Sequence, residues 1–174
     1  MSNASLSQNK LKYLSAYSQK VQDQVSTMLA MDSLGEFIIK KYPNVHNIKN
    51  DKLLRQYVLD LKQRHLKKSA PLSKVIYDKK IHVVNNALGL HTFVSRVQGS
   101  KLKSKNEIRI SEMFKQAPEA FLEMIVVHEL SHIKEKNHDK AFYQLCEHML
   151  PEYHQREFEM RLYLTQLEFK GAIY

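Results

Sequence analysis

The sequence predicts an α+β fold, in which a small antiparallel sheet packs with a motif-bearing helix and with further helices. Two observations predict this class. Apolar residues at spacings of three and four, typical of helices, occupy the first 70 residues and return after residue 118. Between these regions, residues 73–111 contain short β-branched and aromatic runs that are divided by turn residues, as in a sheet.

The length of 174 residues fits one domain of ordinary size with an appended segment. We place an N-terminal helical segment in residues 1–70 and the main domain in residues 71–174. The single cysteine, Cys146, excludes an internal disulfide framework and suits a reducing compartment. The first ten residues lack the apolar stretch of a signal peptide, and the apolar run at 124–127 is far too short to span a membrane. We therefore expect a cytoplasmic protein with no membrane partner.

Three helical pieces are predicted in the N-terminal segment. Residues 11–31 carry apolar side chains at helical spacing and contain no helix breaker. A short piece at 34–41 ends before Pro43, and residues 52–68 repeat the helical pattern before Pro71.

Four short runs predict the strands, and they read SKVIYD, IHVVNN, HTFVSRV and NEIRIS. In the last run Ile108 and Ile110 alternate with Glu107 and Arg109, as in a half-exposed strand. Because no helix-length crossover separates the runs, an antiparallel sheet fits better than a parallel one.

Three helices are predicted to follow the sheet. Residues 118–134 are apolar enough for a buried helix, and Asn137 is the predicted cap of a second helix that ends before Pro151. The apolar stripe of this second helix contains Cys146, which we interpret as a buried packing residue. The last helix is predicted over residues 152–168.

The segment HELSH, residues 128–132, matches the pattern H-E-x-x-H. Positions i and i+4 lie on one face of a helix, so His128 and His132 can present two imidazole nitrogens to one ion. Glu129 is rotated by about 100° around the helix axis and can reach a metal-bound water without ligating the ion. Zinc suits this site, because a catalytic zinc takes three protein ligands and leaves one position for water. We therefore expect one zinc ion per chain.

His138 is the predicted third ligand. It follows His132 by six residues, which is the spacing in H-E-x-x-H-x-x-G-x-x-H, where a glycine lets the chain turn. Glu135 occupies the glycine position here, so Lys136–Asn137 is the predicted corner, with Asn137 in the left-handed backbone conformation that asparagine tolerates. The later helices offer alternative ligands: Glu147, His148, Glu157 and Glu159.

The stretch MIVVHELSHIKEKNHDKAFYQLCEHMLPEYHQ resembles the YgjP-like metallopeptidase family, which is related in pattern to the WLM and SprT-like zinc peptidases. Residues 73–165 follow the family's order of strand region, active-site helix and closing helices. The resemblance implies a zincin-like fold and a zinc-dependent peptidase acting on a protein or peptide substrate. The family motif reads H-E-L-x-H, five residues, then H-x-x-x-F, and it matches His128, Glu129, Leu130, His132, His138 and Phe142.

The predicted reaction is the metal-assisted hydrolysis of an amide. Zinc lowers the pKa of its bound water to about 7, and Glu129 accepts the proton as general base when that water attacks. The strand at 106–110 is predicted to pair an exposed edge with an extended peptide.

Two supporting roles stay open among several residues. A zinc-bound histidine usually donates its other nitrogen to a carboxylate or carbonyl, and Glu135, Asp139 and Glu147 are near in sequence. An oxyanion stabiliser is also required, and the sequence does not rank its candidates: Tyr143, His148, Tyr153, His154, Arg156 and Arg161.

Basic residues concentrate upstream of the motif. Residues 40–109 hold 17 Lys/Arg and four Asp/Glu, whereas residues 110–174 hold seven and eleven. A basic segment attracts polyanions through non-specific electrostatics, so weak nucleic-acid binding is expected at residues 40–109. A well-solvated surface is the simpler interpretation of such Lys-rich runs.

Two alternatives to a peptidase keep the metal. In one, zinc is structural in a basic nucleic-acid-binding protein, which requires a fourth ligand such as His148 or Glu147. In that case Glu129→Gln would be fully functional. In the other, the same site hydrolyses nucleotides and releases phosphate or pyrophosphate, with the phosphates bound by a basic group: Lys101, Lys103, Lys105 and Arg109.

Overall fold

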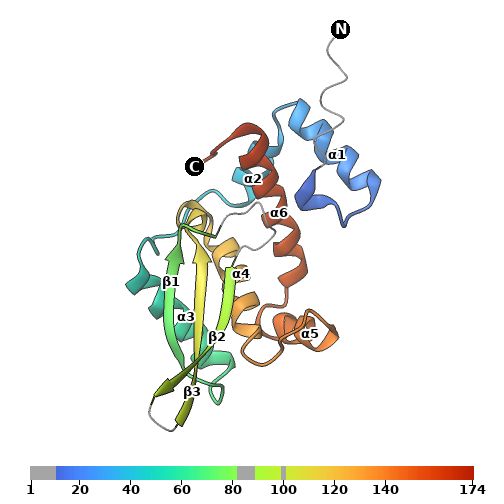
Figure 1. The fold of residues 1–174 in the computed structure, drawn as a ribbon. Helices are drawn as coiled ribbons and strands as arrows, with labels where there is room; N and C mark the ends of the chain where they lie inside the picture. Colours follow the sequence, from blue (N-terminus) through green and yellow to red (C-terminus); the bar gives the residue numbers. More distant parts are fainter. Residues whose placement is uncertain (1–10, 82–88, 99–100) are drawn as a thin grey trace. The chain divides into compact units, whose positions relative to one another are not determined.

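The computed structural model describes residues 11–81, 89–98 and 101–174, and it describes their side chains outside residues 82–105. The chain divides into two compact units, whose elements are drawn in Figure 1. The first unit takes the chain up to Asn44 together with Gln155–Tyr174, and the second unit is Val45–His154. The predicted boundary after residue 70 falls inside the second unit, and the division into an N-terminal helical segment and a main domain stays a prediction.

The first unit is helical, as the N-terminal pattern predicts. The hydroxyl oxygen of Ser18 accepts a hydrogen bond from the backbone N–H of Val21, so the first long helix begins after Ser18. The helix predicted over residues 11–31 is therefore shorter than expected, and a separate 3-10 turn precedes it. The elements are η1 (Lys12–Leu14), α1 (Gln19–Ala30), α2 (Leu34–Lys41) and most of α6 (Tyr153–Lys170).

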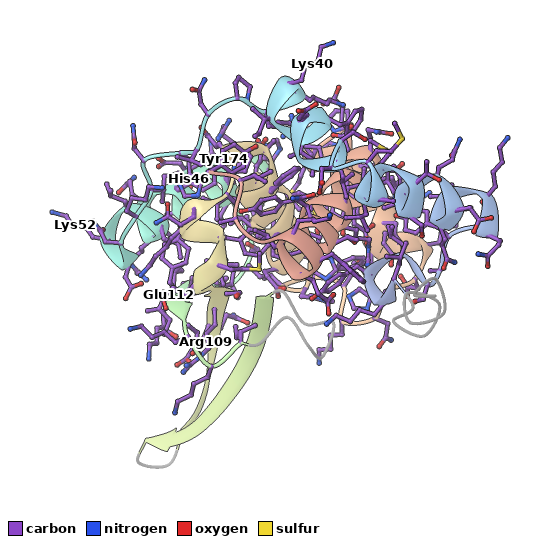
Figure 2. All side chains as sticks on the ribbon, turned by 90° about the horizontal axis from the view of Figure 1, so that it is seen from above. Lys40, His46, Lys52, Arg109, Glu112 and Tyr174 are labelled. Carbon is purple, nitrogen blue, oxygen red and sulfur yellow. The ribbon has the colours of Figure 1, made fainter. Side chains whose placement is uncertain are left out.

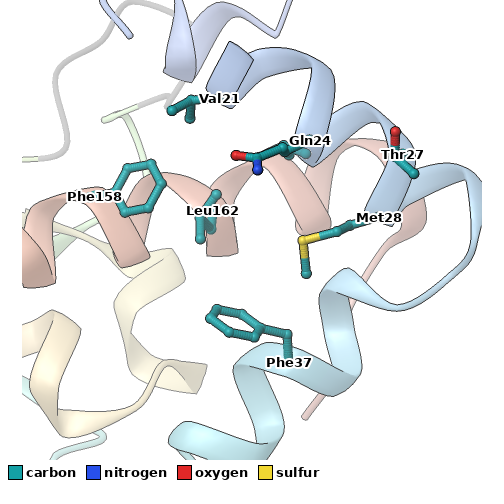
Figure 3. A pocket seen from close by; sticks show the side chains of 8 residues that line it. Val21, Gln24, Thr27, Met28, Phe37, Phe158 and Leu162 are labelled. Carbon is teal, nitrogen blue, oxygen red and sulfur yellow. The ribbon is translucent and has the colours of Figure 1, made fainter. Parts of the chain in front are cut away.

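An apolar pocket of about 600 Å³ lies within the first unit (Figure 3). It is lined by Val21 and Met28 from α1, Phe37 from α2, and Phe158 and Leu162 from α6, among others. None of the residues that line it carries a charge, so this pocket offers no group for acid–base or metal chemistry.

The second unit contains a three-stranded sheet in the order β1-β3-β2, with β1 (Leu72–Asp78), β2 (Gly89–Gln98) and β3 (Lys101–Ser111). The α+β class is confirmed. The sheet is mixed, however, because β2 pairs with β3 in the antiparallel sense and β1 pairs with β3 in the parallel sense. The parallel pair needs a long connection, and β2 with its flanking residues supplies it in place of a helix. Most of the run predicted as a strand at 81–86 lies outside the described residues.

The central position of β3 corrects the predicted peptide-binding edge. The segment 106–110 pairs with β1 on one side and with β2 on the other, so its backbone presents no edge to a substrate. In the described sheet, the outer edges belong to β1 and β2.

Two helices pack on the sheet, α3 (Asp51–His65) against β1 and α4 (Glu119–Ser131) against β2 and β3. The carboxylate of Asp51 accepts a hydrogen bond from the backbone N–H of Tyr77 at 2.8 Å, which ties the start of α3 to β1. Alternate residues of β1 and β3 are buried, as expected for a sheet with one covered face. The buried residues include Val75 and Tyr77 on β1 and Ile108 and Ile110 on β3.

The helix α5 (Lys140–Met149) follows α4, and its cap corrects a second detail. The carboxylate of Asp139, not the side chain of Asn137, accepts the hydrogen bond from the backbone N–H of Phe142 at 3.1 Å. Cys146 is fully buried on α5, as predicted from its place on the apolar stripe. Within the part of the chain that the structure describes, no helix combines the length and apolar composition needed to cross a membrane.

Candidate metal centre

Three imidazole rings converge in the second unit. The Nε2 atom of His138 lies 3.0 Å from Nε2 of His128 and 3.1 Å from Nε2 of His132. Among the described residues, these three histidines are the group of His, Cys, Asp or Glu side chains whose donor atoms all lie within 4.8 Å of one another. Three nitrogens that point to one position are the arrangement that a metal ion requires.

The helix α4 fixes the first two rings. His128 lies within α4, and His132 follows its last residue with φ −64° and ψ −14°, so the helical backbone continues through both residues. The apolar face of the same helix is inaccessible to solvent, since Val126, Val127 and Leu130 are each 0% exposed. A helix anchored in this way cannot turn about its axis, which holds both imidazoles in place.

The chain turns after α4 and returns His138 to the cluster. The backbone N–H of Glu135 donates to the carbonyl of Ser131 at 2.9 Å, so the turn continues the right-handed end of the helix. Among the described residues other than glycine, only Asp32 has a positive φ, and the predicted left-handed corner at Asn137 is therefore wrong. The cap at Asp139 fixes where α5 begins, and His138 immediately precedes that cap.

The hydrogen bonds of His132 set its tautomer. Its Nδ1–H donates to the main-chain carbonyl of Glu135 at 3.0 Å, which leaves the lone pair on Nε2. Burial lowers the pKa of His132, and the nearby His138 lowers it further, while the bond to the Glu135 carbonyl acts in the opposite direction. The ring is thus neutral at pH 7 and suited to ligation. Among the residues considered for this role from the sequence, Glu135 fills it through its backbone.

His128 has a partner that the sequence did not assign. Its Nδ1 lies 2.7 Å from the hydroxyl oxygen of Tyr153, the first residue of α6. Tyr153 is 0% exposed, so water does not compete for this contact. When Nε2 faces a metal ion, Nδ1 carries the proton and donates it to the phenol oxygen.

The phenyl ring of Phe142 packs against all three histidine rings of the cluster. Its centroid lies 4.9 Å from the ring of His128, 4.6 Å from that of His132 and 4.8 Å from that of His138. It is fully buried. One apolar side chain therefore contacts all three candidate ligands and restricts the ways in which their rings can tilt.

Glu129 lies beside the cluster in sequence, one residue after His128, and is 3% exposed. Burying a carboxylate is costly unless its surroundings compensate the charge. The helix places it about 100° around the axis from His128, and that placement separates it from the ligand face.

The alternative ligands named from the sequence lie elsewhere. Glu147 is 3.5 Å from His154, and the ring of His148 is 6.4 Å from that of His65 in an edge-to-face contact. Neither joins the three-histidine group, so the structural-zinc alternative lacks its predicted fourth ligand among the described residues. Two further candidates form ion pairs within the first unit, Glu157 with Arg161 and Glu159 with Lys41.

The basic group proposed to hold phosphates is only partly described. Arg109 pairs with Asp78 at 2.9 Å and with Glu107 at 3.5 Å, so its charge is already compensated. The side chains of Lys101, Lys103 and Lys105 lie outside the described part. Two of the oxyanion candidates lie in contact in the second unit, namely Tyr143 and His154, with ring centroids 5.5 Å apart.

The donor set fits a zinc-type ion. Three imidazoles, two of which have a partner that fixes the tautomer, match the ligands of a catalytic zinc, which needs three protein ligands and an open position. Hard ions such as magnesium prefer oxygen ligands, and no carboxylate of the described residues joins the group.

Fold and site together define a metal-dependent hydrolase. The model of the family described as YgjP-like, metallopeptidase domain, matches residues 6–163, and the chain belongs to this family. The match includes the N-terminal helices, which lie outside the residues 73–165 that follow the family's order of elements. UTP pyrophosphatase of Escherichia coli (strain K12) is 57% identical over 159 residues, which are 91% of this chain and 95% of that protein. No solved structure matches.

Proposed function

We propose that this protein is a zinc-dependent pyrophosphatase that hydrolyses UTP at the site formed by His128, His132 and His138. The 57% identity to a protein named UTP pyrophosphatase, over nearly the whole of both chains, carries this proposal. It favours the phosphoanhydride alternative among the functions that the motif allows. The cluster of three imidazoles supports it, because a metal centre with an open position is needed for either reaction.

The reaction joins the oxygen of a water molecule to the α-phosphorus of UTP. The bond from that phosphorus to the oxygen bridging the α- and β-phosphates breaks, and the electron pair leaves with pyrophosphate, so the products are UMP and pyrophosphate. A zinc ion, when bound, supplies Lewis acidity that makes the water more acidic and offsets negative charge on the phosphate.

The chain's own residues have distinct tasks in this scheme. Glu129 accepts the proton that the attacking water loses. The carbonyl of Glu135 and the hydroxyl of Tyr153 hold His132 and His128 in the tautomers that direct Nε2 to the ion. The ring of Phe142 excludes water from the buried side of the cluster, which strengthens electrostatic interactions there.

A second candidate is the hydrolysis of peptides, which the family's description as a metallopeptidase domain favours. Glu129 would act on the same water, and the carbonyl carbon of an amide would replace the α-phosphorus. An extended peptide would pair with β1 or β2, because β3 is paired on both sides.

One experiment tests both candidates. Metal content is measured by mass spectrometry on dialysed protein, and the same sample is assayed for pyrophosphate release from UTP and for cleavage of unfolded casein. We expect about one zinc ion per chain and UTP hydrolysis that far exceeds proteolysis. The proposal fails if casein is cut and UTP is not.

Three variants complete this test. We expect Glu129→Gln to retain the metal and lose hydrolysis, and His138→Ala to lose the metal as well. His148→Ala is the matched control, since His148 is also an exposed histidine of the second unit but stands outside the cluster. Equal metal loss in both histidine variants would refute the assignment of His138.

A further inference from the structure

Aromatic rings adjoin the metal centre on its exposed side. Tyr143 on α5 is half-buried, and the side chain of His154, the second residue of α6, is 54% exposed. Both belong to the second unit. The scheme proposed for the hydrolysis uses neither residue.

The rings form a series that leads away from the cluster. The ring of Tyr143 lies 6.4 Å from that of His138 with an angle of 32° between their planes. It also lies 5.5 Å from the ring of His154, at 36°. The plane of the Tyr143 ring is therefore inclined by no more than 36° to that of either neighbour, and an aromatic face of this kind suits a planar ligand.

Packing holds Tyr143 in position before any ligand arrives. The ring of the buried Phe142 meets it edge to face at 5.2 Å and 87°. The ring of Tyr153 lies 6.3 Å away at 52°. A ring that is already fixed loses little conformational entropy when a ligand stacks on it.

Charges of both signs lie near these rings, since the carboxylate of Glu147 is 3.5 Å from His154 and two lysines flank His138 in sequence. Lys136 and Lys140 are exposed and lie two residues before and after His138. Basic side chains beside a metal centre stabilise phosphate groups, and an aromatic ring adjacent to them suits the base of a nucleotide.

We propose that Tyr143, with His154 beside it, forms the subsite on which the nucleobase of a nucleoside triphosphate stacks while its phosphates reach the metal centre. This inference rests on the proposed UTP hydrolysis and adds the residue that recognises the base. Stacking, rather than the phenol hydroxyl, provides the binding.

The test compares Tyr143→Leu, which removes the ring, with Tyr143→Phe, which removes only the hydroxyl. Kinetics are measured with UTP and with inorganic tripolyphosphate, which has the phosphoanhydride bonds but no base. Binding of UMP and of inorganic phosphate to the zinc-loaded protein is measured by calorimetry.

We expect Tyr143→Leu to raise KM for UTP and Kd for UMP by about tenfold, the typical value of one stacked base, with kcat within about twofold of wild type. Tyr143→Phe should restore both constants to near wild-type values. Phosphate affinity, and any tripolyphosphate hydrolysis, should be unchanged in both variants.

Three results would overturn the inference. Equal defects in Tyr143→Phe and Tyr143→Leu would assign the effect to the hydroxyl. Phosphate binding that weakens together with UMP binding would indicate general damage to the site. Unchanged UMP affinity in Tyr143→Leu would remove the subsite while leaving UTP hydrolysis intact, whereas a wild-type protein that does not hydrolyse UTP would refute the proposed function itself.

Discussion

The hydroxyl oxygen of Tyr153 lies 2.7 Å from Nδ1 of His128 and links the first residue of α6 to the helix that carries the HELSH motif. A partner of this kind fixes the orientation of a ligating imidazole and raises its basicity. Tyr153 is therefore a positioning residue for the metal centre, although it does not belong to the motif.

The variant Tyr153→Phe is expected to bind zinc about 10- to 100-fold more weakly, the usual cost of losing such a partner, while the helices remain folded. The ring stays and only the hydroxyl is removed, so packing changes little. Competition with a chelator of known affinity, followed by circular dichroism, measures both properties.

The matched control is Tyr77→Phe, which removes another hydroxyl with a 2.7 Å partner in the same unit, the carbonyl of Ile48. It should cost about 1 kcal/mol of unfolding free energy and leave zinc affinity unchanged. If both variants weakened zinc binding equally, the contact between Tyr153 and His128 would have no special role.

Phe142 contacts all three histidine rings, so we expect Phe142→Leu to affect both stability and zinc affinity. The loss in unfolding free energy should be smaller than the roughly 3–5 kcal/mol of a Phe→Ala change, because leucine fills part of the space. Urea unfolding of the metal-free protein and zinc competition are the measurements.

Phe114→Leu controls for the loss of a buried ring, since Phe114 is also 0% exposed and lies in the same unit. It should be destabilised to a similar degree with normal zinc affinity. Normal zinc affinity in Phe142→Leu would show that the ring only fills the core.

His46 predicts a pH dependence of stability. It is 5% exposed, its Nε2–H donates to the carbonyl of Phe114 at 2.7 Å, and its Nδ1 accepts from the backbone N–H of Ile48 at 3.0 Å. Burial lowers the pKa of His46, and the bond to the Phe114 carbonyl opposes this only in part. The folded state therefore favours the neutral ring.

Because the folded pKa lies below the ordinary value of about 6.5, the stability that His46 contributes is complete above that pH and is lost as pH falls through the lowered pKa. The non-titrating variant His46→Gln should be less stable than wild type at pH 7.5, and the difference should shrink by pH 5.5. Urea unfolding of both metal-free proteins measures this difference. The contributions of the other histidines to the pH dependence are the same in both proteins and cancel in the comparison. A difference that stays constant with pH would contradict the role of His46.

The features that the sequence predicted well depend on local geometry. The helix at 34–41 has the predicted bounds, and the pairing of His128 with His132 follows from the turn of a single helix. The approach of His138 to these two histidines could also be predicted, because six residues are enough for the chain to turn and bring a third side chain back to them. The class of fold was accessible for the same reason, since helical and alternating patterns are properties of short segments.

The features that it missed depend on contacts between distant segments or on a choice between similar residues. The parallel pairing of β1 with β3 is decided by strand order, which no single run encodes. Tyr153 meets His128 across 25 residues, and no spacing rule connects them. Asn137 and Asp139 are both good caps, and only the point at which α5 begins selects Asp139.

The basic segment at residues 40–109 supports a last prediction, weak binding of nucleic acid. Several of its lysines are exposed in the second unit, and the side chain of Lys52 points away from α3 into solvent (Figure 2). We expect wild type to bind a 20-nucleotide RNA at low salt. It should release the RNA as salt rises, because binding releases counterions and this release is less favourable at high salt. A quadruple Lys→Gln variant should bind more weakly and show a shallower salt dependence, with UTP hydrolysis unchanged. The four residues are Lys52, Lys67, Lys68 and Lys74.

Fluorescence anisotropy across a salt series measures this binding, with Lys20→Gln as the control for an exposed lysine outside the basic segment. Unchanged binding in the quadruple variant would place the interaction elsewhere on the chain. If wild type showed no binding even at low salt, the lysines would serve only to keep the surface hydrated, which is the ordinary role of a Lys-rich face.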